Sequence, residues 1–293
     1  MKKILITGVN SYVGNSFENW VKQWPTEYKV DKISVRDDSW KEKEFSRYDV
    51  ILHVAGIAHV STDPKMEELY YKVNRDLTIE IAKKAKLEGV KQFIFMSSII
   101  IYGDSSHINE KRVITKDTIP TPSNFYGKSK LQAEEGVLPL QDENFNIVVI
   151  RPPMIYGKGS KGNYQLLSKI AKKSPVFPNL DNERSMIHID NLCEFIRLII
   201  RNEEKGMYFP QNEEYVKTSE MVKVIANING RKIILTKVFN LLLKIMSNFT
   251  IVIDKAFGSL VYDKSMSEYK NKYIIRNFKD SIRVTEIKNI KRS

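Results

Sequence analysis

Residues 3–14 read Lys3-Ile4-Leu5-Ile6-Thr7-Gly8-Val9-Asn10-Ser11-Tyr12-Val13-Gly14. The apolar run before Gly8 predicts a short buried strand, and a helix is expected from about Tyr12 to Val21. A strand, a glycine turn and a helix in this order aim backbone N–H groups and the positive helix end at a pyrophosphate. The stretch therefore predicts the start of a doubly wound, parallel α/β sheet of the Rossmann type that binds a dinucleotide.

The glycine spacing departs from the usual one in this turn. It reads Gly-x-x-Ser-x-x-Gly, so Ser11 stands where a glycine is common. A small serine still permits close approach of the backbone, but it weakens the pattern. We expect the cofactor to contact Gly8, Asn10, Ser11, Tyr12, Val13 and Gly14.

The second strand, about Val30 to Val35, ends in Arg36-Asp37-Asp38. An acidic residue there would accept hydrogen bonds from the adenosine ribose, whereas an arginine would favour the 2′-phosphate of NADP. We favour NADP(H), with Arg36 as the contact. Only about a dozen residues separate Asp38 from the next strand at 49–54, so the strand usually found between them should be missing or reduced.

Composition points to a cytoplasmic protein with a large core. The chain has 293 residues, of which 42% are apolar. Its single cysteine, Cys193, lies among apolar residues, so we interpret it as core and expect no disulfide. The apolar run at the N-terminus is too short for a signal peptide, and no apolar stretch approaches the length of a membrane span.

The net charge is +12, and the region from Lys264 to the end is strongly basic. No zinc-finger spacing or RNA-binding signature accompanies it, so nucleic acid is not an expected partner. A solvated terminus is the simplest interpretation, and contact with an anionic membrane surface is the alternative. His53 and His59 lack a second set of ligands, so no metal site is predicted.

Tyr126 and Lys130 are spaced to share one face of a helix. A nearby ammonium favours the phenolate, so we expect the tyrosine pKa to fall from about 10 toward neutral pH. The strand that precedes this helix, from Phe93, ends in the polar pair Ser97-Ser98. Because doubly wound folds bind ligands at the carboxyl ends of their strands, Ser98 is a second candidate site residue.

Further motifs follow in one order along the chain. They are His53-Val54-Ala55-Gly56, Asn74 on a helix from about Lys65 to Leu87, Arg151-Pro152-Pro153-Met154-Ile155-Tyr156-Gly157 after the strand at 146–150, and Arg184-Ser185-Met186-Ile187-His188-Ile189-Asp190. With these motifs, residues 3 to about 206 resemble an extended short-chain dehydrogenase/reductase of the NAD-dependent epimerase/dehydratase family. Its members act on nucleotide sugars.

The resemblance implies a division of the chain and roles for its residues. A Rossmann domain would comprise residues 1–153 and about 187–207, and a substrate-binding lobe about 154–186 and 208–293. Ser98 and Tyr126 would bind the sugar oxygen at the reacting carbon, and Lys130 would hold the nicotinamide ribose. Other implied cofactor contacts are Val54, Ala55, Gly56, Asn74, Met96 and Pro153, and Asn163 and Arg184 would bind the substrate.

Two departures from the family pattern narrow the reaction. Met154 replaces the usual asparagine of the Arg-x-x-Asn-x-Tyr-Gly motif, so one polar contact to substrate is lost. Ile99 and Ile100 replace the Asp-Glu pair that dehydratase relatives carry after the catalytic Ser/Thr. Neither isoleucine can move a proton, so a 4,6-dehydratase is excluded.

Within the family, the chain most resembles members from bacterial capsule and polysaccharide clusters. The resemblance implies an oxidoreductase that reduces a UDP-4-keto-6-deoxy-N-acetylhexosamine at C4. A UDP-sugar 4-epimerase of the UDP-glucose or UDP-GlcNAc type, with tightly bound NAD, is the first alternative. A member that binds NADP without turnover is the second.

The C-terminal third is expected to build the substrate lobe. Residues 158–164 form a basic, glycine-rich loop suited to a diphosphate, although an ordinary surface loop has the same composition. Residues 238–249 place Val238, Leu241, Leu242, Ile245 and Phe249 on one helical face. We expect this helix to pack on its own core. A peripheral membrane contact, a glycosyltransferase contact and a homodimer stay open.

Overall fold

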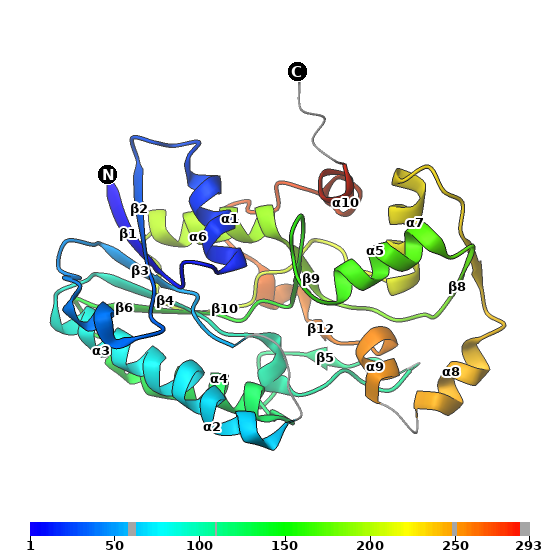
Figure 1. Ribbon diagram of the computed structural model, residues 1–293, viewed down its shortest axis with the longest axis horizontal. Coiled ribbons are helices and arrows are strands. Elements are labelled where there is room, and N and C mark those ends of the chain that lie inside the picture. The colour runs from blue at the N-terminus through cyan, green and yellow to red at the C-terminus, as the bar shows by residue number, and fades with distance from the viewer. Residues whose placement is uncertain (58–62, 109, 248–250, 288–293) are drawn as a thin grey trace.

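The computed structural model describes residues 1–57, 63–108, 110–247 and 251–287. His59, Phe249 and the last six residues of the basic terminus therefore lie outside the described residues. Within them, the chain forms a parallel sheet at one end and a smaller, mixed lobe at the other (Figure 1). This confirms the predicted α/β class with a C-terminal lobe.

The central sheet has six strands in the order β10-β6-β4-β3-β1-β2, and every neighbouring pair is parallel. Its strand order reverses beside β1, which is the position where doubly wound folds bind their ligands. The strands are β1 (Lys2–Thr7), β2 (Tyr28–Ile33), β3 (Val50–His53), β4 (Gln92–Met96), β6 (Asn146–Ile150) and β10 (Gly206–Tyr208).

The expected loss of a strand after Asp38 is confirmed. Residues 34–49 contain a short 3₁₀ helix (Asp38–Glu42) and no strand, so β2 forms the edge of the sheet. Trp40 and Phe45 from this segment are buried against the sheet. They cover apolar sheet residues in place of the absent strand. The second strand begins and ends two residues earlier than predicted, because its register follows β1 from Lys2 and Tyr28 onward.

Helices cover both faces of the sheet (Figure 1). On one face α1 (Tyr12–Val21) and α6 (Ile189–Arg201) pack on alternate strand residues such as Ile4 and Ile6. On the other, α3 (Leu77–Leu87) and α4 (Phe125–Val137) pack on Leu5, Ile51 and Phe93. Because both faces are buried there, the central strands β3, β4 and β6 are mainly apolar, as expected for a parallel sheet. Cys193 lies in this core, as predicted.

The helix predicted from about Lys65 to Leu87 is continuous, but it is not α-helical throughout. A 3₁₀ turn (Pro64–Met66) leads into α2 (Glu67–Tyr70), then a π-helical segment (Tyr71–Asp76) and α3. Such π segments often occur at functional sites. Here the segment contains Asn74, whose side chain is fully buried.

The smaller lobe has its own apolar core, which includes Tyr156, Phe177, Met221 and Phe278. In the described part of the chain, three two-stranded pairs and five α-helices build it. The pairs are β7 (Met154–Tyr156) with β9 (Met186–His188), β8 (Val176–Pro178) with β11 (Ile234–Thr236), and β5 (Val113–Ile114) with β12 (Val261–Tyr262). The helices are α5 (Asn163–Lys173), α7 (Thr218–Ile228), α8 (Asn240–Ser247), α9 (Ile251–Phe257) and α10 (Phe278–Glu286).

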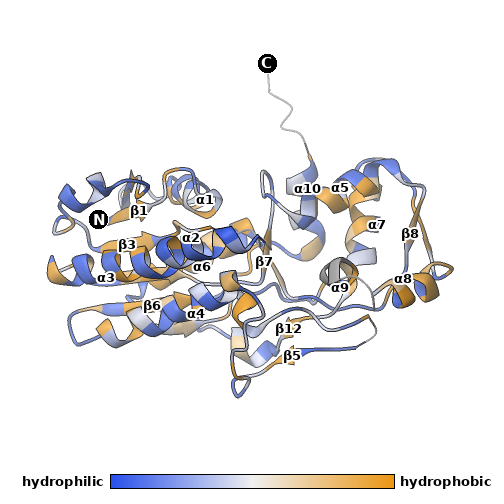
Figure 2. Cartoon of the chain, turned by 60° about the horizontal axis from the view of Figure 1, so that its bottom comes forward, coloured by the Kyte–Doolittle hydropathy of each residue, from blue (hydrophilic) through white to orange (hydrophobic). Residues whose placement is uncertain are grey.

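The expectation that the predicted helix at 238–249 packs its apolar face on the core is wrong. Leu241, Leu242 and Ile245 are exposed on α8, and Val238 just before it is 80% exposed. The helix instead turns Leu243 toward a small cluster around Leu180. Figure 2 shows the apolar colour of α8 at the end of the lobe remote from the central sheet. Across the described residues, no helix combines the length and apolar character needed to cross a bilayer.

Candidate functional site

The turn after β1 has the geometry of a phosphate-binding turn. Gly8 has φ +97°, and a Cβ there would lie 3.1 Å from the Ala55 Cα. A Cβ on Gly14 would lie 2.8 Å from the Ile6 side chain, so both glycines are required. Ser11 caps α1, because its Oγ accepts a hydrogen bond from the Gly14 N–H at 3.2 Å. The departure from glycine at this position therefore has a local structural reason.

Tyr12 supplies a test of whether this turn fits a polar ligand. Its hydroxyl is buried and has no hydrogen-bond partner within the described part of the chain. Burial raises the pKa of this hydroxyl well above its usual range, with Cys193 and Asp190 adding to the shift, so it remains a donor. Gly157, from the Arg151–Gly157 motif, leaves it room, since a Cβ there would lie 2.8 Å from the Tyr12 oxygen. An unpaired buried donor beside a glycine turn fits a dinucleotide.

Ser98 and Tyr126 meet at the carboxyl end of β4. Ser98 caps a 3₁₀ helix (Ile99–Tyr102) and accepts a hydrogen bond from the Ile100 N–H at 3.3 Å. Burial raises the pKa of Tyr126 to about 12, and a hydrogen bond with the Ser98 side chain opposes this shift. The predicted fall of the tyrosine pKa is therefore not observed, because desolvation dominates.

Lys130 lies one turn after Tyr126 on α4, and its ammonium points to the sheet. Its Nζ donates to the Met96 carbonyl at 2.8 Å and lies 4.7 Å from the centre of the Phe95 ring. Burial lowers the pKa of Lys130 to about 8. A Cβ on Gly56 would approach this ammonium to 3.3 Å, so the loop after β3 and the lysine share one small space.

Asn74 links the loop after β3 to α4 through hydrogen bonds. Its Oδ1 accepts from the Ile57 N–H at 2.8 Å, and its Nδ2 donates to the Ser129 Oγ at 3.2 Å. Ser129 in turn donates to the Tyr126 carbonyl at 2.9 Å. Asn74 thus braces Gly56 against the helix that carries the tyrosine. Val54, Ala55, Met96 and Pro153, predicted as cofactor contacts, lie at strand ends on the same edge as Gly8.

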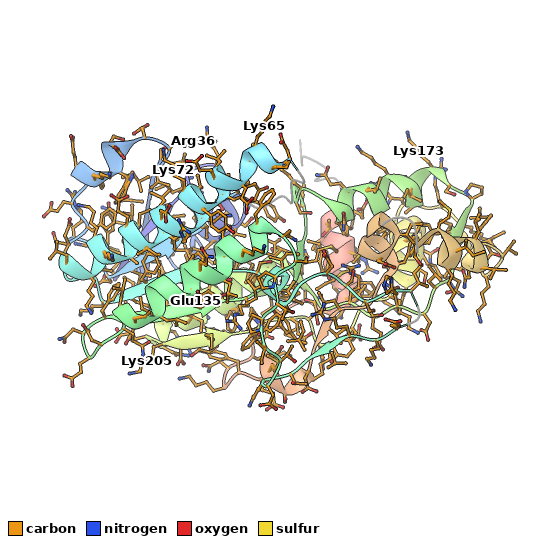
Figure 3. The ribbon with its side chains drawn as sticks, turned by 90° about the horizontal axis from the view of Figure 1, so that it is seen from below. Arg36, Lys65, Lys72, Glu135, Lys173 and Lys205 are labelled. Atoms are coloured by element: carbon orange, nitrogen blue, oxygen red, sulfur yellow. The ribbon has the colours of Figure 1, made fainter. Side chains whose placement is uncertain are left out.

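Arg36 and Asp37 are the two candidates for contact with the adenosine ribose at the end of β2. They differ in whether their side chains already have hydrogen-bond partners. The Asp37 carboxylate accepts hydrogen bonds from the Ser39 N–H and hydroxyl, which lower its pKa. The Arg36 guanidinium is exposed and makes no side-chain hydrogen bond or ion pair in the described parts of the chain. It borders a groove of about 1150 Å³ with Lys41 and Lys72, and Figure 3 shows it at the surface. Of the two residues, Arg36 is therefore the one whose side chain has no partner among the described residues and carries the charge to bind an anion.

The predicted substrate residues occupy separate places in the lobe. Asn163 is exposed at the first position of α5, directly after Gly162, which has φ +97°. Arg184 lies just before β9, and its backbone forms isolated β-bridges with Val216 and Leu260. Burial lowers the pKa of its guanidinium to about 10. Its Nη1 donates to the Gly258 carbonyl at 3.3 Å.

A buried ionic network, which the sequence does not predict, lies behind Ser98. Arg151 Nε donates to both oxygens of Glu134 at 3.1 Å, and its Nη1 donates to the Tyr102 hydroxyl at 2.7 Å. Ser97 donates to the same carboxylate. Tyr262 on β12 donates to the Arg151 carbonyl at 3.0 Å. The network joins β4, α4 and the smaller lobe, and the only sequence signal for it is that Glu134 lies four residues after Lys130.

His53 is a core residue whose two ring nitrogens bond threonine hydroxyls. Nδ1 lies 2.7 Å from the Thr7 Oγ1 and Nε2 lies 2.9 Å from the Thr78 Oγ1. Since Thr78 gives its proton to the Asn74 carbonyl, Nε2 carries the ring proton and Nδ1 accepts. Burial, with a smaller effect of Lys130, lowers the pKa of His53 to about 3.

This pKa predicts a loss of stability in acid. The histidine pKa is depressed on folding, so its contribution is complete above its ordinary value of 6.5 and declines as the pH falls toward 3. The slope is about 1.4 kcal/mol per pH unit. Between pH 6.5 and 5, we expect the free energy of unfolding of wild type to fall by about 2 kcal/mol more than that of His53→Gln, as measured by urea unfolding. Parallel pH profiles for the two proteins would contradict the assignment.

Comparison with known proteins agrees with this geometry. A model of the NAD dependent epimerase/dehydratase family matches residues 4–210. A UDP-glucose 4-epimerase from Vibrio cholerae is 30% identical over 250 residues, which are 77% of this chain and 75% of that protein. An N-acetyl-alpha-D-glucosaminyl-diphospho-ditrans,octacis-undecaprenol 4-epimerase from Escherichia coli O157:H7 is 30% identical over 69% of this chain and 64% of its own length.

Solved structures extend the similarity over the smaller lobe. A dTDP-4-dehydrorhamnose reductase from Clostridium acetobutylicum has a TM-score of 0.74 at 19% identity, covering 97% of this chain and 98% of its own. A UDP-glucuronic acid 4-epimerase from Bacillus cereus, solved with NAD, has a TM-score of 0.71 at 16% identity, covering 97% and 95%. At these identities the structures show the fold. Because the family model covers most of the chain, the protein belongs to the NAD-dependent epimerase/dehydratase family.

Proposed function

We propose that the protein uses NADPH to reduce the C4 ketone of a UDP-4-keto-6-deoxy-N-acetylhexosamine, in the supply of capsule or polysaccharide precursors. The observation that carries the proposal is that Ser98 and Tyr126, which interact through their side chains, lie at the ligand-binding edge of the sheet. In this proposal Ser98 orients the C4 oxygen and Tyr126 gives it a proton. When bound, the nicotinamide would supply the hydride to C4.

The protonation states of the site suit the reducing direction. With a pKa of about 12, Tyr126 holds its proton at neutral pH and can act as the acid that reduction requires. Lys130, with a pKa of about 8, is mostly protonated at pH 7 and would donate to the nicotinamide ribose.

The surrounding residues are assigned in the same proposal. The cofactor phosphates would lie at Gly8–Gly14, where the glycines are required and Tyr12 is an unpaired donor. Arg184 and Asn163 would hold the diphosphate and sugar of the substrate. Ile99 and Ile100 offer no acid or base after Ser98, so the substrate would arrive already dehydrated.

Turnover of two substrates side by side tests the proposal. With UDP-4-keto-6-deoxy-GlcNAc we expect one NADPH to be oxidised for each C4 hydroxyl formed, and with UDP-GlcNAc we expect no reaction. NADPH binding without oxidation, in the presence of the keto sugar, would instead identify a member that senses the cofactor.

A 4-epimerase is the second candidate, and the similarity to the Vibrio cholerae UDP-glucose 4-epimerase favours it. An epimerase must retain its cofactor, because the same hydride returns to the sugar. The exposed edge at Arg36, with no strand after β2, favours cofactor exchange instead. Purified protein that carries stoichiometric NAD⁺ and interconverts C4 epimers without added NADPH would establish the epimerase and exclude the reductase.

Cofactor selectivity gives a further prediction. Arg36→Ala should weaken NADPH binding by about 10- to 100-fold, because a charge-assisted hydrogen bond to the 2′-phosphate is lost. NADH binding should stay within about twofold, since NADH lacks that phosphate. Lys41→Ala is the matched control: Lys41 borders the same groove but pairs with Asp38 and Glu80. Equal losses for both cofactors, measured by fluorescence titration, would remove Arg36 from this role.

A further inference from the structure

The helix α8 presents a continuous apolar surface to solvent. At about 100° per residue, the exposed apolar side chains within the helix, which are Leu241, Leu242, Ile245 and Met246, fall within one arc of about 140°. Val238 and Phe239, in the turn just before the helix, are also exposed. Val238 is 80% exposed, Leu241 71% and Leu242 56%. We call this surface the α8 face; its members are Val238, Phe239, Leu241, Leu242, Ile245 and Met246.

The inner side of α8 carries polar residues as well as Leu243. Asn240 donates through Nδ2 to the Asn179 carbonyl at 2.9 Å, and Ser247 is buried and bonds the Lys244 carbonyl at 2.8 Å. Leu243 alone of the leucines packs inward. The helix thus buries its amides and hydroxyls and exposes its leucines, which is the reverse of an ordinary surface helix. A contiguous exposed apolar surface of this kind marks a binding site.

The sequence around the α8 face is predominantly basic. An exposed carboxylate, Asp181, lies near Lys237 but pairs with Lys217. Residues 221–253 contain no aspartate or glutamate, and neither do residues 152–180. The two stretches meet where β8 pairs with β11. Figure 3 shows Lys173, on α5, projecting outward at this end of the molecule. The first stretch carries Lys223, Arg231, Lys232, Lys237 and Lys244, and the second carries Lys158, Lys161, Lys169, Lys172 and Lys173.

Lys244 lies about 60° from the edge of this apolar arc on the helical wheel, and Lys237 lies in the segment just before the helix. A helix with a leucine-rich face bordered by lysines is the pattern of segments that lie in the plane of an anionic membrane surface. A second copy of the chain does not fit as well, because pairing two α8 faces would bring two acid-free, basic stretches together.

We propose that the α8 face docks the protein on an anionic membrane surface, with its leucines among the acyl chains and its lysines at the headgroups. This goes beyond the proposed reaction and does not depend on it. The face lies at the end of the molecule opposite the central sheet, so docking leaves the carboxyl ends of β1, β3 and β4 uncovered (Figure 1).

Vesicle co-sedimentation of the full chain tests the proposal. We expect wild type to bind phosphatidylcholine vesicles that contain phosphatidylglycerol at least about tenfold more tightly than pure phosphatidylcholine, with the difference reduced by salt. The triple variant Leu241→Ser/Leu242→Ser/Ile245→Ser should lose at least about tenfold in binding to the mixed vesicles. Lys237→Glu/Lys244→Glu should lose the preference for the anionic lipid.

Two controls make the test decisive. Leu87→Ser/Ile119→Ser removes equally exposed but isolated apolar side chains and should bind as wild type does. Circular dichroism and NADPH binding should be unchanged in every variant, since α8 carries no residue of the site. Wild type without anionic preference, or a triple variant that binds as tightly, would overturn the proposal. A dimer that the triple variant dissociates, without vesicle binding, would identify a second copy as the occupant and also overturn it.

Discussion

Replacement of Tyr126 by phenylalanine is expected to lower kcat for the C4 reduction by about 10²–10⁴-fold, the usual contribution of a general acid. The ring is buried and packs edge-on to Tyr70 with centroids 6.0 Å apart, so the phenylalanine keeps these contacts. Only the hydroxyl, its proton and its interaction with the Ser98 side chain are lost. Stopped-flow oxidation of NADPH with the keto sugar measures the effect.

Tyr156→Phe is the matched control for this experiment. Tyr156 is also a buried tyrosine, and its hydroxyl bonds Ser281 and Asn212 in the smaller lobe. Its loss should lower the free energy of unfolding by about 1 kcal/mol and leave kcat within a few-fold of wild type. If the kcat of Tyr126→Phe is also within a few-fold of wild type, Tyr126 is not the proton donor.

The parts of the fold that the sequence predicts well are those with local causes. The alternation of apolar strand, Gly8 turn and helix is contained within residues 3–21, and the structure reproduces it. The missing strand after Asp38 follows from chain length alone, since about a dozen residues cannot form a further βαβ unit. The 146–150 strand agrees residue for residue because both its faces are buried and its apolar run ends at Arg151.

The parts that it predicts poorly depend on partners far along the chain. Spacing placed Lys130 beside Tyr126, but burial by the whole fold sets the tyrosine pKa. The pattern at 238–249 predicts an apolar helical face but not what packs against it. In the structure that face is exposed, and Asn240 on the opposite side donates to the Asn179 carbonyl. Spacing alone also gave no reason to pair Glu134 with Arg151.

That pair is expected to give a large effect on stability. Glu134→Leu leaves the Arg151 guanidinium buried with only neutral partners, and removal of one member of a buried ion pair costs about 3–5 kcal/mol. Urea unfolding at pH 7 measures this loss. Glu80→Ala, in the half-exposed pair with Lys41, should cost less than about 1 kcal/mol.

The double variant Glu134→Leu/Arg151→Met separates a buried-charge penalty from a simple loss of packing. With both charges removed, an apolar pair of similar volume should recover most of the stability that Glu134→Leu loses. If the double variant is no more stable than the single one, the unpaired guanidinium is not the cause. Ser97 would also lose its acceptor in both variants, and it precedes Ser98 directly. We therefore expect kcat to remain several-fold below wild type even where stability returns, because the strand end that carries Ser98 is then held less firmly.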